Sequence, residues 1–244
     1  MDIVIKKLKR YILYISVAVI FSIASFVIFF MSDYGKNRII SFTNKYIPVR
    51  IEFKDFSLNI FKGRIEIYDL VIYDDSDVII GKIKKIALSI QYKPLFSGKY
   101  VADHLIIIEP SIDVSSTQIS QIKKKIKNKD KITEDNIDKK TPDLVVNKLE
   151  ILNTVLMYKD TERSSEYGFK TKKISATVDN KNSDYSLNTV NSRISIKTDK
   201  INKTIINDSL NISLKDSDLN IKKARFRTEG LDISFIGLVN DLFT

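Results

Sequence analysis

The chain has 244 residues, a formal net charge of +10 at pH 7, one histidine and no cysteine. The absence of cysteine excludes a disulfide framework, a thiolate metal site and a cysteine nucleophile, and a single histidine cannot build a multi-histidine zinc site or a conventional serine–histidine hydrolase. We therefore expect a protein that is not an enzyme and that holds neither a metal nor a cofactor.

An uncharged apolar run occupies residues 11–31. At about 1.5 Å per helical residue it measures about 31 Å, which matches the hydrocarbon core of a bilayer. Four cations precede it and favour a cytoplasmic amino terminus: Lys6, Lys7, Lys9 and Arg10. We predict that residues 1–31 form a cytoplasmic flank and a single transmembrane anchor, and that the rest of the chain is exported.

A cleaved signal peptide is the alternative interpretation of this run. Ser22 and Ala24 provide small residues at the positions that cleavage needs. Cleavage there would leave "SFVIFFM" as an exposed apolar end, and the hydrophobic region would be only part of a longer run. The uncleaved anchor is therefore the favoured interpretation.

The positive charge is concentrated in two places, and neither indicates nucleic-acid binding. One group flanks the anchor and the other lies in "QIKKKIKNKDKITEDNIDKK", residues 121–140. Ile119, Ile122 and Ile126 have a weakly amphipathic helical spacing, and the segment lacks the aromatic residues of a nucleic-acid reader. We predict a solvated helix and linker over residues 117–142, for which anionic lipid head groups are the fitting partner.

Residues 33–46 predict a short helix after the anchor, and period-two alternation follows it. Ile86, Leu88 and Ile90 alternate with polar or small residues, as in a half-buried strand. The phase of the alternation changes between Ile67 and Leu70, which predicts a β-bulge that bends the sheet. Similar strands over residues 210–214 and 231–238 indicate a mainly β protein with one apolar and one polar sheet face.

A weak internal repeat divides the β region into two units. "VADHLIIIEPSIDVSS" and "VVNKLEILNTVLMYKD" each contain an apolar strand, a break at Pro110 or Asn153, and a second strand. The lysine-rich stretch separates them. We therefore predict a first β module over residues 32–116 and a second β unit over residues 143–244.

Three consecutive stretches resemble a known family. The segments "FSLNIFKGRIEIYDLVIYD", "KIKKIALSIQYKPLFSGK" and "VADHLIIIEPSIDV" are similar to the amino-terminal module of the AsmA and TamB superfamily of bacterial envelope proteins. The resemblance covers residues 1–115, and a looser one extends through "KARFRTEGLDISFIGLVNDL". The matching residues are Asp69, Leu70, Ile72, Asp74, Pro94, Leu95, Phe96, Ser97, Gly98, Lys99, Glu109, Pro110 and Ile112.

The resemblance implies a fold and a function of the bridge-like lipid-transfer type. The expected fold is a curled antiparallel β-sheet, a β-taco or open-barrel-like groove, anchored in the bacterial inner membrane and projecting into the periplasm. The expected function is phospholipid transport between inner and outer membranes, or envelope biogenesis, with acyl chains, the inner membrane and an outer-membrane or envelope protein as partners. The residues that we expect to line the groove are Ile65, Ile67, Ile86, Leu88, Ile90, Leu105 and Ile107.

A closed sandwich is the alternative to an open groove at the level of sequence. The same alternation is produced by the core of a closed sandwich. The protein would then be a scaffold with a partner at its sheet edge, similar to the short, singly anchored component of type II secretion systems. About fifteen strands at about 4.8 Å each would give a groove of about 70 Å, too short to bridge two membranes alone.

The candidate polar sites are weak. Asp74, Asp75 and Asp77 cluster in a turn, but the spacing lacks the glycine and distal glutamate of an EF-hand, so a solvated turn is favoured over a cation site. His104, next to Asp103, is interpreted as an ordinary residue at the start of a strand rather than half of a catalytic pair.

Overall fold

The computed structural model describes residue 29 and residues 32–133, 144–179, 184–215 and 218–240. The predicted anchor and its four cations, Lys6, Lys7, Lys9 and Arg10, lie outside these residues. Within the described ranges, none of the helices has the length and apolar character needed to cross a bilayer.

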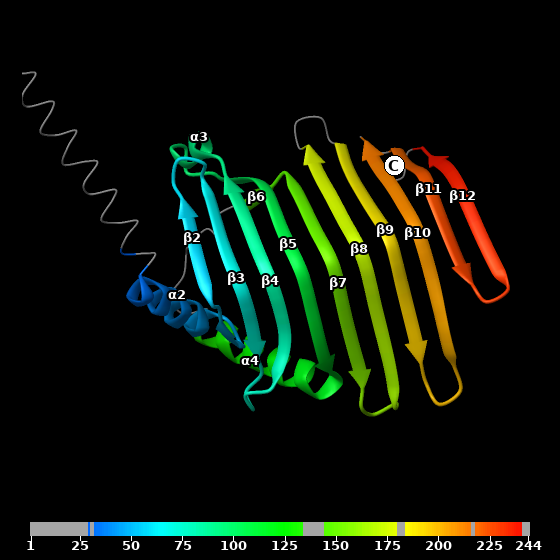
Figure 1. The fold of residues 1–244 in the computed structure, drawn as a ribbon, viewed down its shortest axis with the longest axis horizontal. Coiled ribbons are helices and arrows are strands. Elements are labelled where there is room, and N and C mark those ends of the chain that lie inside the picture. The colour runs from blue at the N-terminus through cyan, green and yellow to red at the C-terminus, as the bar shows by residue number, and fades with distance from the viewer. Residues whose placement is uncertain (1–28, 30–31, 134–143, 180–183, 216–217, 241–244) are drawn as a thin grey trace, which may run out of the picture.

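The described part of the chain is mainly β, as predicted, and its strands form one open sheet (Figure 1). The main strand order is β1-β3-β4-β5-β7-β8-β9-β10-β11-β12, while β2 pairs with β3 and β6 pairs with β5. The strands are β1 (Arg50–Glu52), β2 (Asp55–Asn59), β3 (Arg64–Tyr73), β4 (Ile79–Ile90), β5 (Tyr100–Ser115), β6 (Leu144–Val146), β7 (Lys148–Asp160), β8 (Ser165–Asp179), β9 (Asp184–Lys197), β10 (Asn202–Lys215), β11 (Asp218–Thr228) and β12 (Leu231–Val239). The helices are α2 (Asp33–Tyr46), α3 (Tyr92–Leu95) and α4 (Ser116–Thr133).

The prediction of an entirely antiparallel sheet is wrong at one junction. Strand β5 pairs in parallel with β6 and β7, so the sheet is mixed. Two parallel neighbours require a crossover between them, and the lysine-rich segment that begins with α4 supplies it. The two halves of the weak repeat therefore lie side by side in one sheet, with Leu105 opposite Leu149 and Ile107 opposite Ile151.

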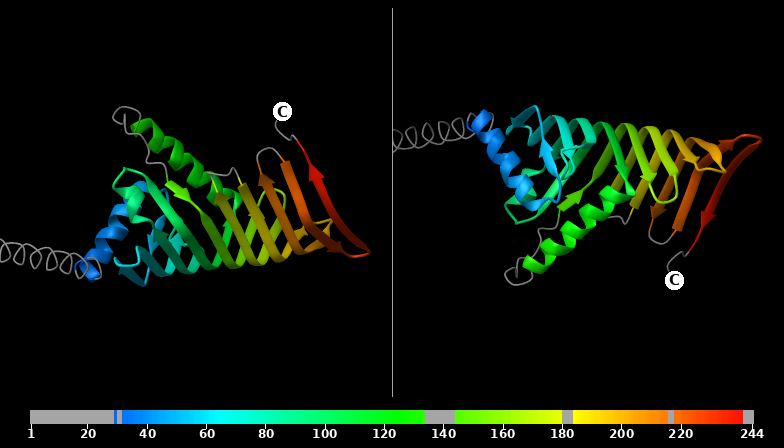
Figure 2. Two further views of the ribbon diagram at one scale, coloured as in Figure 1. Left: turned by 90° about the horizontal axis from the view of Figure 1, so that it is seen from above. Right: turned by 90° about the horizontal axis from the view of Figure 1, so that it is seen from below.

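Both longer helices belong to the amino-terminal half of the sheet (Figures 1 and 2). Helix α2, predicted over residues 33–46, ends beside β1. There the Asn44 side chain accepts a hydrogen bond from the backbone N–H of Ile51 at 2.8 Å and donates one to its carbonyl at 3.1 Å. Helix α4 is attached to the β3–β4 turn, where Gln118 donates to Asp74 at 2.7 Å. Asn44 thus occupies backbone groups at one edge of the sheet that would otherwise be open to pairing.

A row of left-handed residues crosses the sheet from β3 to β9. Asp69, Glu109, Asn153 and Asn191 have φ values of 50°, 54°, 54° and 52°. The strand pairings before and after each of these residues place them at the same level on β3, β5, β7 and β9, and one residue from each of β4, β8 and β10 lies at that level too. This kinked row consists of Asp69, Lys84, Glu109, Asn153, Lys172, Asn191 and Asp208.

The kinked row explains the phase change that the sequence shows between Ile67 and Leu70. The β3–β4 register is the same before and after it, with Tyr68 opposite Lys85 and Leu70 opposite Ile83. The change in the phase of the alternation is therefore caused by a left-handed residue, Asp69, and not by the β-bulge that we predicted. Between β11 and β12, in contrast, the register shifts between Ile221 and Ala224, where Lys222 and Lys223 of β11 lie against one residue of β12, Ile236. This bulge is on β11, whereas the phase change in the sequence is on β12.

Candidate functional site

Six of the seven predicted lining residues form two rows on one face of the sheet. Ile65, Leu88 and Leu105 are directly opposite one another on β3, β4 and β5, as are Ile67, Ile86 and Ile107. Ile90, at the end of β4, lies opposite Ala102 after a register shift, and alternation places it on the same face as Leu88. The structure therefore brings the predicted residues together.

Both rows continue far beyond the residues that sequence analysis selected. The first row extends through Leu149, Ala176, Leu187, Ile212 and Ile221. The second row extends through Ile151, Ile174, Thr189, Leu210, Ala224 and Phe235. The alternation at residues 149–151 and 210–212 could have indicated these further lining residues. Only the pairing of β5 with β7, however, shows that the rows of the two halves of the sheet are continuous.

A third apolar row runs along the other side of the kinked row. Its members are Ile72, Ile112, Leu156, Phe169, Ile194 and Ile205, with Gly81 between the first two. In a regular strand, residues such as Ile67 and Ile72 would point to opposite faces. The left-handed residue between them reverses the alternation at that point. The apolar side chains before and after it therefore lie on the same face of the sheet.

A row of buried small side chains lies between the kinked row and this third row. Thr154, Thr171, Ser192 and Asn207 are only 4–5% exposed and pair across β7, β8, β9 and β10. Leu70, on β3, has the corresponding position and is 7% exposed. No second layer covers these strands in the part of the chain that the structure describes, so neighbouring rows must shield them. This burial indicates that the sheet folds toward its apolar face along the kinked row.

The same polar side chains satisfy backbone groups beside the kinks. The Thr171 hydroxyl lies within hydrogen-bond distance of the carbonyls of Lys173 and Val190, at 3.2 and 3.1 Å. The Asn207 side-chain amide donates to the carbonyls of Ser209 and Arg225, at 3.3 and 3.0 Å. A buried carbonyl without a partner is costly, so these contacts stabilise the bend.

The apolar face is open. All seven predicted lining residues are half-buried, and no large side chain among the described residues is fully buried. Leu187 and Ile194 remain 39% and 40% exposed, and Phe235 on β12 is 44% exposed. A closed sandwich would bury these rows in a core. The sheet is not closed, so the rows form an exposed apolar surface.

The opposite face carries clusters of charged side chains. Glu150 lies in the middle of it, 2.6 Å from Lys173, 3.5 Å from Lys148 and 2.7 Å from Nε2 of His104. The hydrogen bond from Lys173, followed by the charge of the two lysines, lowers the pKa of Glu150 to about 2. Glu150 was not among the residues predicted from the sequence, although a carboxylate inside the apolar strand "KLEILN" was the signal.

A second cluster on this face surrounds Glu66. Its carboxylate lies 2.8 Å from Arg64 and 2.9 Å from Lys85, and Tyr68 donates a hydrogen bond to it. The hydrogen bond from Tyr68 is the main cause that lowers the pKa of Glu66. We call this face the hydrophilic face because of these clusters; apolar residues such as Ile106 and Leu152 also lie on it.

The three aspartates of the "YDDSD" turn have structural partners. Asp74 accepts hydrogen bonds from the backbone N–H groups of Ser76 and Val78, at 2.8 and 2.9 Å, and from Gln118. The Gln118 contact is the main cause that lowers the pKa of Asp74. Asp77 pairs with Arg50 and Asp75 with Lys125. Over the described ranges, no group of three or more His, Cys, Asp and Glu residues is placed to hold a metal ion.

No protein-family model matches this chain, and no curated protein matches it in a sequence search. The family resemblance given by the three sequence stretches therefore remains a prediction. What the geometry itself offers is a long, open apolar surface on one side of a sheet whose other side is hydrophilic. Such a surface can shelter hydrocarbon from water without any covalent chemistry.

Proposed function

We propose that this protein is a bacterial inner-membrane protein with a periplasmic β-sheet whose curled apolar face holds phospholipid acyl chains. It would act in phospholipid transport between the inner and outer membranes, or in envelope biogenesis, as expected for a member of the AsmA and TamB superfamily. The observation that supports this proposal best is the continuity of the two apolar rows from β3 to β11, on a face that no other layer of the described residues covers.

The energetic role of such a face is simple. Each acyl methylene exposed to water costs about 0.8 kcal/mol, so sheltering about ten of them lowers the free energy by about 8 kcal/mol. Head groups can stay in water at the open side of the trough. Neither a nucleophile nor a nucleotide at this protein is required for a lipid to move along the rows.

Helix α2 supports a position at a membrane surface. Tyr34 and Phe42 are 57% and 65% exposed, and Arg38 lies 5.7 Å from the centre of the Tyr34 ring. Aromatic and cationic side chains together are typical of the membrane–water interface. The helix directly follows the predicted anchor of residues 11–31, so both would be held at the same membrane.

The length of the sheet argues for a partner rather than a complete bridge. Ten strands follow one another along the main path, and at about 4.8 Å each they extend about 45 Å, which is less than the 70 Å expected from the sequence. Strand β12 is exposed along its whole length, including Ile236 at 75% and Leu238 at 60%. This edge favours a second candidate function, a scaffold that pairs with another envelope protein without transferring lipid.

Lipid transfer between vesicles tests the main proposal. The full chain, reconstituted into donor vesicles, should speed the movement of a fluorescent phospholipid to acceptor vesicles. The variant Ile151→Asp places a carboxylate in the second apolar row and should slow this transfer about tenfold, because charge in an apolar track is costly. Leu152→Asp, one residue along on the hydrophilic face, is the matched control and should leave transfer nearly unchanged. Equal effects of the two variants, or no transfer above protein-free vesicles, would reject lipid transport.

A further inference from the structure

The hydrophilic face contains a pocket of about 520 Å³ beside the kinked row, where cations of three strands converge. The pairings place Val155, Lys170, Arg193, Ile206 and Arg227 in one row across β7, β8, β9, β10 and β11. Strand alternation directs this row away from the apolar face. Along this row, Lys170 and Arg193 lie between two apolar lining residues, Val155 on β7 and Ile206 on β10.

Three of the four cations that line the pocket lack acidic partners among the described residues. Elsewhere, Lys85 pairs with Glu66 and Lys173 with Glu150, at 2.9 and 2.6 Å. In the part of the chain that the structure describes, Lys170, Lys172 and Arg193 have no carboxylate within 4 Å. Lys170 and Arg193 are also direct cross-strand neighbours, and like charges in that position destabilise a sheet. The pocket therefore carries positive charge that the chain itself does not neutralise.

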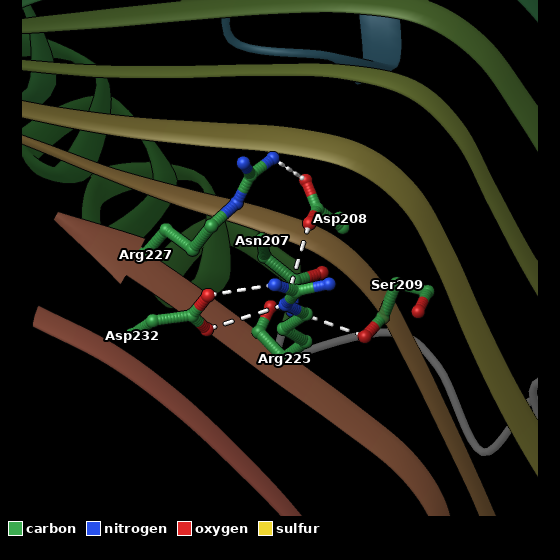
Figure 3. A network of polar contacts seen from close by, with 6 residues as sticks. All are labelled: Asn207, Asp208, Ser209, Arg225, Arg227 and Asp232. Carbon is green, nitrogen blue, oxygen red and sulfur yellow. Dashed lines mark hydrogen bonds and ion pairs between the residues drawn. The ribbon is translucent and has the colours of Figure 1, made fainter.

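Arg227, the fourth cation at the pocket, differs from the other three because it has an acidic partner. Its guanidinium lies 2.5 Å from Asp208, and Asp208 also approaches Arg225, which pairs with Asp232 at 2.7 Å (Figure 3). Figure 3 shows these side chains gathered over β10 and β11. Asp208 and Asp232 are thus paired with Arg225 and Arg227 at the β11 side of the pocket. Lys170, Lys172 and Arg193 are left for a ligand at the other side.

Two amide side chains lie beside these cations. Asn153 and Asn191 also line the pocket and are exposed. The pocket thus combines cations and amide donors, a set that fits an anion with several acceptor oxygens.

We propose that this pocket binds a phosphate group carried on a larger molecule. The planar fork of Arg193 suits two phosphate oxygens at once, while Lys170 and Lys172 add point charges. The volume lies in the usual range of small-molecule sites, so a substituent of the phosphate can pack on Val155 or on Ile206. The site lies on the face opposite the apolar rows and is independent of lipid transport along them.

Titration calorimetry on the full chain in a maltoside detergent tests the site. The probes are inorganic phosphate, glycerol 3-phosphate and the water-soluble lipid dihexanoyl phosphatidylglycerol. We expect saturable binding that Arg193→Gln weakens about tenfold or more. Lys200→Gln, which makes the same charge change in the exposed β9–β10 turn, should leave the affinity nearly unchanged. Glycerol 3-phosphate binding as tightly as the lipid would assign a soluble phosphoester, whereas much tighter lipid binding would assign a head group.

Two outcomes would overturn the proposal. One is the absence of saturable binding for all three probes. The other is an equal loss of affinity in Arg193→Gln and Lys200→Gln, which would mean diffuse attraction to a basic protein. The variant Ile151→Asp separates this site from the apolar rows, because it should slow lipid transfer while leaving phosphate binding intact.

Discussion

Leu88 and Leu70 offer a direct comparison between the open apolar face and the buried bend. Leu88 lies between Ile65 and Leu105 in the first apolar row and is half-buried. Leu70 lies next to the kinked row and is 7% exposed. Replacing either residue by alanine removes the same atoms from neighbouring strands of one sheet. The difference in cost therefore reports the environment.

The expected magnitudes follow from burial. A leucine truncated to alanine in a closed core costs about 2–5 kcal/mol, which includes a term for the cavity left behind. For Leu70→Ala we expect a loss of about 3 kcal/mol in the free energy of unfolding. For Leu88→Ala we expect about 1 kcal/mol, because part of the side chain is already in water and no closed cavity forms.

Urea unfolding of the full chain in lipid nanodiscs measures both values. Far-ultraviolet circular dichroism or tyrosine fluorescence can follow it, since the chain has 11 tyrosines and no tryptophan. The wild-type slope of free energy against urea should be retained in both variants. An equal loss of stability in Leu88→Ala and Leu70→Ala would refute the open face, because it would mean that the first row is as enclosed as the bend.

Three further predictions concern polar residues. The depressed pKa of Glu150 contributes stability that is fully present above about pH 4.5 and is lost as the pH falls toward about 2. Glu150→Gln should therefore lower the free energy of unfolding by about 1–2 kcal/mol at pH 7, which is less than the full pKa shift implies because the lysine partners are partly exposed. The variant should also lose less stability than the wild type as the pH falls. An unchanged stability–pH profile would count against the cluster. Asn44→Ala removes two hydrogen bonds to the β1 edge, so amide exchange at Ile51 should become much faster, and unchanged protection would contradict this role. Asn153→Val forces a β-branched residue to a φ of 54° and should cost about 1–2 kcal/mol in thermal unfolding, whereas Asn153→Gly should be tolerated; equal behaviour would argue against the left-handed kink.

The apolar rows were predictable because strand alternation is a local property. Within each strand, a few residues of sequence are enough to show which side chains share a face, as for Ile65 with Ile67 and Ile86 with Leu88. The phase change before Leu70 was visible for the same reason. Its physical form was not, because a bulge and a left-handed residue produce the same one-residue shift in the pattern.

The long-range features could not be read from the chain alone. The weak repeat aligns residues 101–116 with residues 145–160, but only the crossover through α4 makes β5 and β7 parallel neighbours. Nor does any local pattern show that Asp69, Glu109 and Asn153 fall into one row, since that depends on the register of every strand between them. The pairing of Glu150 with His104 likewise depends on that register.

Photo-crosslinking in living cells tests the central claim, that the apolar face is an open lipid-holding surface. A photoreactive amino acid would replace Ile107 in the second apolar row or, as a matched control, its neighbour Ile106 on the hydrophilic face. Mass spectrometry of the adducts would follow. If the apolar face is open, we expect phospholipid adducts from position 107 and few or none from position 106. Adducts only to protein at position 107, or equal lipid adducts at both positions, would contradict it.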